Sequence, residues 1–132
     1  MASIDYGYLR TLEGTSFDDA EERITAALKE QGFGILTEID VQETLKKKLD
    51  VDFDRYKILG ACNPQLAHQA LQQEQFIGLV LPCNVVLTED DAGDAVVAIL
   101  KPESMFGAVA VEGMDELVEE ADTRLQAALE AL

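Results

Sequence analysis

The sequence has few of the residues from which common catalytic and metal-binding motifs are built. It contains two cysteines, one histidine, three prolines and no tryptophan. It has no glycine-rich phosphate-binding loop and no CxxC pair, which argues against the common nucleotide-binding and dithiol redox motifs. One histidine and two cysteines are too few for a zinc site unless carboxylates complete it. We therefore expect neither a metal nor a cofactor.

Long hydrophobic runs and basic residues are also scarce. No stretch approaches the roughly 18 apolar residues of a membrane-spanning helix, and the N-terminal MASIDYGYLR is too polar for a signal peptide. The chain carries 26 acidic and 10 basic residues, a formal net charge of −16. Such a surface repels nucleic acids and anionic membranes, so we expect neither as a partner. We expect a cytoplasmic protein in which both cysteines are reduced.

The same excess of acidic residues weakens the folded state through self-repulsion, which dissolved salt screens. Two interpretations stay open at this point. The surface is either an adaptation to a high-salt setting or that of an ordinary acidic cytosolic protein.

The length of 132 residues and the hydrophobic content of 48% indicate one globular domain, residues 1–132. Apolar alternation predicts strands over residues 6–13, 33–39, 56–61, 84–89 and 95–101, the last two forming an antiparallel hairpin. Helical periodicity predicts helices over residues 17–31, from 41, from 64, and over 114–131. Three polar residues suit the N-caps of the first three helices: Ser16, Asp40 and Asn63.

Two of these helices have apolar faces that we expect to be buried. In the second helix the face consists of Val41, Leu45 and Leu49. In the third it consists of Leu66, Ala67, Ala70 and Leu71.

Both cysteines and the histidine lie in two stretches, residues 58–71 and 81–87, that include the third helix and the starts and ends of the strands beside it. Cys62 comes directly before the Asn63–Pro64 helix start, where free N–H groups and the helix dipole lower a thiol pKa. The alternative is that Cys62 is a small buried hydrophobic residue. Cys83 follows Pro82 at the start of a strand, where a buried packing role is the simpler interpretation.

Three sequence blocks together resemble the family called domain of unknown function 302: AALKEQGFGILTEIDVQETLKKKL, YKILGACNPQLAHQAL and GLVLPCNVVL. The resemblance extends from about residue 8 to the C-terminus. It implies an α+β fold in which a curved antiparallel sheet carries helices on one face, similar to the TATA-box-binding-protein-like fold. It also implies homodimers. It implies no activity, because none is established for the family.

Two functions from different classes remain open. The first is a non-catalytic homodimeric binding or interaction protein whose sheet or dimer groove holds a small-molecule ligand, with Asn63, His68 and Glu38 as candidate ligand-binding residues. The second is a thiol-dependent redox or sulfur-transfer protein, with Cys62 as nucleophile and Cys83 as its resolving partner. His68 lies about 130° from the apolar face of its helix, so we expect it to be exposed.

Overall fold

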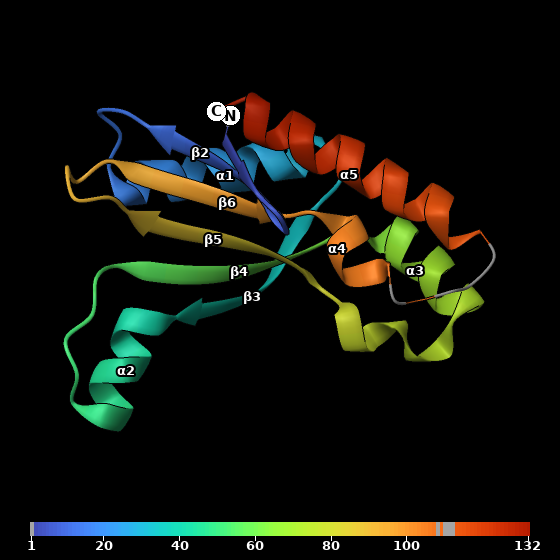
Figure 1. Ribbon diagram of the computed structural model, residues 1–132, viewed down its shortest axis with the longest axis horizontal. Helices are drawn as coiled ribbons and strands as arrows, with labels where there is room; N and C mark the ends of the chain where they lie inside the picture. The colour runs from blue at the N-terminus through green and yellow to red at the C-terminus, as the bar shows by residue number, and fades with distance from the viewer. Residues whose placement is uncertain (1, 108, 110–112) are drawn as a thin grey trace.

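A six-stranded antiparallel sheet forms the frame of the molecule (Figure 1). This computed structural model describes residues 2–107, 109 and 113–132, and its strands lie in the order β1-β2-β6-β5-β4-β3. The strands are β1 (Ala2–Ile4), β2 (Gly7–Leu12), β3 (Gly34–Asp40), β4 (Tyr56–Cys62), β5 (Cys83–Glu89) and β6 (Ala95–Leu100). Every pairing is antiparallel, including the predicted β5–β6 hairpin. The α+β class expected from the sequence is confirmed.

The helices are α1 (Phe17–Glu30), α2 (Val41–Leu49), α3 (Pro64–Gln73), the 3₁₀ helix η1 (Gln75–Val80), α4 (Pro102–Phe106) and α5 (Met114–Glu130). The four longer helices, α1, α2, α3 and α5, begin where the sequence predicted. The side chains of Ser16, Asp40 and Asn63 each accept a hydrogen bond from a backbone N–H three residues on, at 3.0–3.1 Å. These caps satisfy N–H groups that have no partner within the helix, and so fix each start locally.

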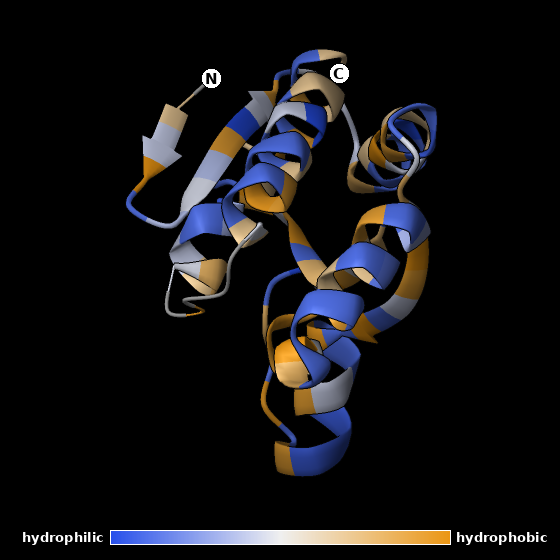
Figure 2. Ribbon diagram, turned by 90° about the vertical axis from the view of Figure 1, so that its right-hand side faces the viewer, coloured by the Kyte–Doolittle hydropathy of each residue, from blue (hydrophilic) through white to orange (hydrophobic). Residues whose placement is uncertain are grey.

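The main core lies between one face of the sheet and the helices α1 and α5. Every second residue of the central strands points into it, as in Leu87, Val97 and Ile99. Ile24 of α1 and Leu125 of α5 are fully buried against these strands. In Figure 2 the helices nearest the viewer are largely hydrophilic on their outer surfaces, as expected for helices that bury one stripe.

The opposite face of the sheet consists of uncharged residues within the described strands. Residues opposite one another on neighbouring strands point to the same face, so the register defines this surface. Val86 of β5 lies opposite Ala98 of β6 and Ile58 of β4, so these three side chains lie on this surface. We call this surface the open sheet face; its side chains belong to Leu9, Thr11, Thr37, Ile39, Tyr56, Ile58, Asn84, Val86, Thr88, Val96, Ala98 and Leu100. In Figure 1, α1 passes behind β2 and β6, on the other side of the sheet.

The predicted burial of two helical faces is wrong in part. Leu49 of α2 is 66% exposed, and α2 contains no buried residue. Leu71 of α3 is 44% exposed, although Ala70 beside it is buried. These side chains are exposed because of where the helices lie in the fold. α2 packs beside β3 and β4, and α3 packs against α5 and η1. Neither helix is covered by a second layer on its far side. The short β1 and η1 were not predicted.

Salt is expected to raise the melting temperature of this protein. The ion pairs among the described residues engage seven of the 26 acidic side chains, so they leave most of the negative charge of the chain uncompensated. Raising sodium chloride from about 0.01 M to 1 M shortens the Debye length from about 30 Å to about 3 Å and screens the resulting repulsion. Calorimetry should show a steady rise, which should shrink at a pH near 4, where many carboxylates are protonated. A flat curve at neutral pH would contradict a salt-adapted surface.

Candidate functional site

An apolar pocket lies at the end of the sheet, where β4 runs into α3. We call it the end pocket; its walls include Ala61, Cys62, Asn63, Leu66, Cys83, Phe106, Met114 and Leu117. These residues come from β4, β5, α3, α4 and α5, so the pocket exists only after the sheet and the helices have packed together. Its free volume is about 40 Å³, enough for a few small atoms.

Both cysteines lie at this pocket. Cys62 is the last residue of β4, and Cys83 is the first residue of β5. The register pairs Ala61 with Cys83, which places Cys62 one residue further along the neighbouring strand. Cys62 is half-buried and Cys83 is 6% exposed, and both thiols are free. Two residues separated in the sequence by an entire helix thus line one cavity.

The environment of the pocket opposes thiolate formation. Burial in apolar surroundings raises the pKa of the Cys62 thiol. Burial, together with the nearby Cys62, raises the pKa of Cys83 to about 11. The lowered pKa expected for Cys62 at a helix start is therefore not found, because desolvation dominates there. At neutral pH both groups are thiols, which are weak nucleophiles.

The other candidate residues separate into one that lies at the pocket and two that do not. Asn63 lines the pocket, is 6% exposed, and uses its Oδ1 to accept the backbone N–H of Leu66 at 3.1 Å. His68 is exposed on α3, as expected. Glu38 lies on β3, where it pairs with Lys57 at 2.7 Å. The structure therefore brings together Cys62, Cys83 and Asn63, and leaves His68 and Glu38 outside.

Comparison with known proteins agrees with this fold. The family model described as "Domain of unknown function DUF302" matches residues 8–132. The chain belongs to the DUF302 family. A crystal structure described as an uncharacterized conserved protein DUF302 from Bacillus stearothermophilus is similar, with 29% sequence identity and a TM-score of 0.87. The match covers 97% of this chain and 98% of that chain. No curated protein gives a significant match.

The family and the fold predicted from the sequence are thus confirmed. The DUF302 description names no activity, so any function must be inferred from the residues themselves.

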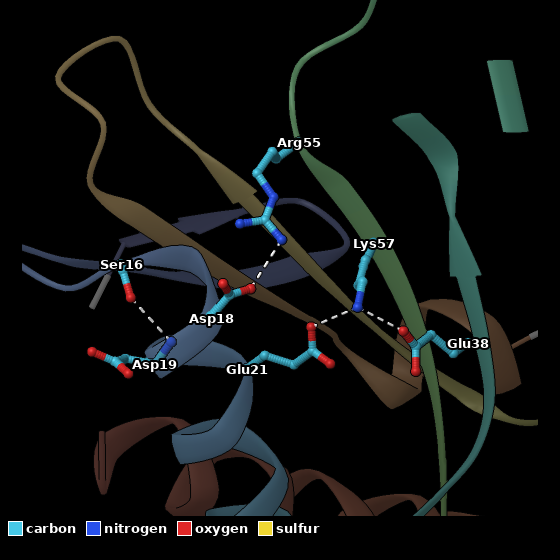
Figure 3. A network of polar contacts seen from close by, with 7 residues as sticks. All are labelled: Ser16, Asp18, Asp19, Glu21, Glu38, Arg55 and Lys57. Atoms are coloured by element: carbon cyan, nitrogen blue, oxygen red, sulfur yellow. Dashed lines mark hydrogen bonds and ion pairs between the residues drawn. The ribbon is translucent and has the colours of Figure 1, made fainter. Parts of the chain in front are cut away.

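A second site of this DUF302 protein is a polar network that links α1 to the sheet (Figure 3). It was not predicted from the sequence. The Lys57 ammonium lies 2.9 Å from Glu21 of α1 and 2.7 Å from Glu38 of β3. The hydrogen bonds that the Lys57 ammonium donates to Glu38 and Glu21 raise the pKa of Lys57. One signal was present in the sequence: Lys57 occupies the same face of β4 as the buried Leu59 and Ala61, so its charge required a partner.

Next to this network, Arg55 pairs with Asp18 at 2.9 Å and stacks over the Phe17 ring, 3.9 Å from its centroid. All of these side chains have partners within the fold, and they connect the start of α1 to β3 and β4. We therefore assign this network to packing rather than to ligand binding.

Two further findings concern metals and membranes. Within the described part of the DUF302 chain, no three or more His, Cys, Asp or Glu side chains gather closely enough to hold a metal ion together. Among the same residues, every helix is too short or too polar to span a bilayer.

Proposed function

We propose that this DUF302 protein is a non-catalytic homodimeric interaction protein whose two protomers meet through the open sheet face. The observation that supports this is the separation of charge. Each chain carries a net charge of −16, yet the open sheet face consists only of uncharged residues across its strands. Two copies that repel each other elsewhere can pack closely along this surface, where no unpaired charge would have to be buried.

The size of the open sheet face suits such a contact. The five strands β2 to β6, spaced about 4.8 Å apart and each roughly six residues long at about 3.4 Å per residue, cover about 500 Å². Two such faces together bury about 1,000 Å², the minimum area expected of a specific interface. Its centre is aliphatic, with Val86, Ala98 and Ile58 side by side. A self-complementary face of this kind fits two-fold symmetry, in which both subunits use the same surface.

Light scattering tests this proposal directly. At micromolar concentration and moderate salt, the protein should have about twice the mass of one chain. Lowering the salt should weaken the dimer, because the repulsion between the two protomers is then less screened. A monomer at every concentration and every salt level would overturn the proposal.

The thiol-dependent activity remains a second candidate because both cysteines line one pocket. Alkylation kinetics separate the two candidates. We expect Cys62, which is half-buried, to react faster than the buried Cys83, with an apparent pKa above the value of about 8.5 for a free cysteine, because burial raises the pKa of Cys62. Cys62→Ser should remove the fast phase, and Cys83→Ser should leave it in place. An apparent pKa below that of a free cysteine would instead favour the thiol-dependent activity.

A further inference from the structure

We propose that residues 41–55 form an arm that packs against the second copy of the chain in the dimer, beside the open sheet face. We call this segment the α2 arm; it consists of α2 and the loop that leads into β4. Figure 1 shows it set apart from the other helices, on the side of the sheet where β3 and β4 lie. The inference rests on the proposed dimer and adds a second contact region to it.

The α2 arm carries three large apolar side chains that the chain itself leaves largely uncovered. Leu49 is 66% exposed, Val51 is 45% exposed and Phe53 is 46% exposed. The side-chain amide of Gln42 donates a 2.9 Å hydrogen bond to the backbone carbonyl of Phe53, which holds the loop against α2. Leu49 follows Gln42 by about two helical turns and so lies on the same side of α2. Leu49 and the loop that carries the other two side chains are therefore on one side of this helix.

These side chains continue the open sheet face beyond the edge of the sheet. The Phe53 ring meets the Tyr56 ring edge to face, with 6.1 Å between the ring centroids. Tyr56 belongs to the open sheet face, because it lies two residues before Ile58 on β4 and points to the same side. Ile39, which is paired with Ile58, is also exposed on this face. A second copy that covers the open sheet face therefore also reaches Phe53.

The area of the contact supports this arrangement. The open sheet face alone gives a dimer contact of about 1,000 Å², only the minimum for a specific interface. A large apolar side chain that is about half exposed presents roughly 100 Å² to a partner. The three apolar side chains of the α2 arm on each protomer add about 600 Å² and bring the contact to about 1,600 Å², the standard size of a stable interface.

The charge of the α2 arm also suits a second copy of this chain. Residues 41–55 contain four basic and four acidic side chains, so this segment has no net charge. The remaining residues contain six basic and 22 acidic side chains and carry the whole net charge of −16. Lys46, Lys47 and Lys48 at the end of α2 place positive charge beside the apolar side chains. The α2 arm can therefore approach an acidic second copy without adding to the repulsion between the two.

The absence of tryptophan from the chain allows a direct test by fluorescence. In Phe53→Trp, the single indole should lie in water in the monomer and be covered by the second protomer in the dimer. Its emission should shift to shorter wavelength over the concentration range in which light scattering shows the dimer to form. Phe76→Trp is the matched control: Phe76 of η1 is 69% exposed and lies outside both the α2 arm and the open sheet face. Its emission should not change with concentration.

Phe53→Ser gives a second measurement that does not depend on the probe. It should raise the dissociation constant of the dimer about 100-fold, because two aromatic rings leave the interface, whereas Phe76→Ser should leave this constant unchanged. Circular dichroism should show that both serine variants remain folded, since each replaces an exposed side chain.

Two results would overturn the role of the α2 arm and leave the dimer itself in place. One is a constant emission of Phe53→Trp while light scattering shows a dimer. The other is a dissociation constant of Phe53→Ser equal to that of the unmodified protein. A monomer at every concentration would instead overturn the dimer and the α2 arm contact together, so the two failures are distinguishable.

Discussion

Val86→Glu is expected to convert the proposed dimer into a monomer. Val86 lies on the central strand β5, on the open sheet face, beside Ala98 and Ile58. In a two-fold dimer the substitution would bury two unpaired carboxylates, one from each protomer, at a cost of several kcal/mol. We expect the dissociation constant to rise by about 1,000-fold or more, since each 1.4 kcal/mol or so corresponds to a factor of ten. Light scattering over a concentration series measures this.

Leu79→Glu is the matched control for that experiment. Leu79 is an apolar residue of η1 that is 88% exposed and lies outside the open sheet face. The substitution Leu79→Glu adds the same charge as Val86→Glu, so general repulsion between protomers increases equally. If Leu79→Glu dissociates the dimer and Val86→Glu does not, the interface involves η1 rather than the sheet. Circular dichroism should show that both variants remain folded, because neither Val86 nor Leu79 is fully buried.

Gly60→Ala is expected to lower the free energy of unfolding by about 3 kcal/mol, the upper end of the usual cost of overpacking. A Cβ at Gly60 would clash with Oγ1 of Thr37 on β3 and would lie 2.7 Å from Cγ of Pro82. The Thr37 side chain can rotate away, but the proline ring is held by the chain that enters β5. The strands β3 and β5 would therefore have to shift relative to β4. Urea denaturation measures the loss of stability.

Gly34→Ala is the control for this second variant. Gly34 lies at the start of the neighbouring strand β3, and a Cβ built there meets no atom within 4 Å. The change should leave the stability nearly unaltered or raise it slightly, because alanine restricts the unfolded chain more than glycine does. Equal losses of stability in the two variants would show that the backbone flexibility of glycine matters more than the crowding around Gly60.

The sequence alone does not determine the chemistry of the end pocket. It shows that a cysteine precedes an Asn–Pro helix start and that a second cysteine begins a later strand. It does not show whether solvent reaches either sulfur. The helix start and the surrounding apolar side chains act on the Cys62 pKa in opposite directions, and only the packing of α3, α4 and α5 around the pocket determines that the pKa rises.

The sequence by itself determined the helix starts at Ser16, Asp40 and Asn63, the alternation of the central strands, and membership of the DUF302 family. These features could be predicted because capping bonds and strand alternation depend on residues within a few positions of one another.

The tertiary structure decided which apolar surfaces are covered. A pattern such as Val41, Leu45 and Leu49 shows that a helix has an apolar face, but burial requires another layer of the fold to lie against that face. The register of the six strands leaves the open sheet face without charge and brings Glu38 of β3 beside Lys57. The packing of α1 on the sheet supplies the second partner of Lys57, Glu21. Contacts of this kind join residues that are distant in the sequence. Their energies depend on distance and on exclusion of water, which exist only in the folded chain.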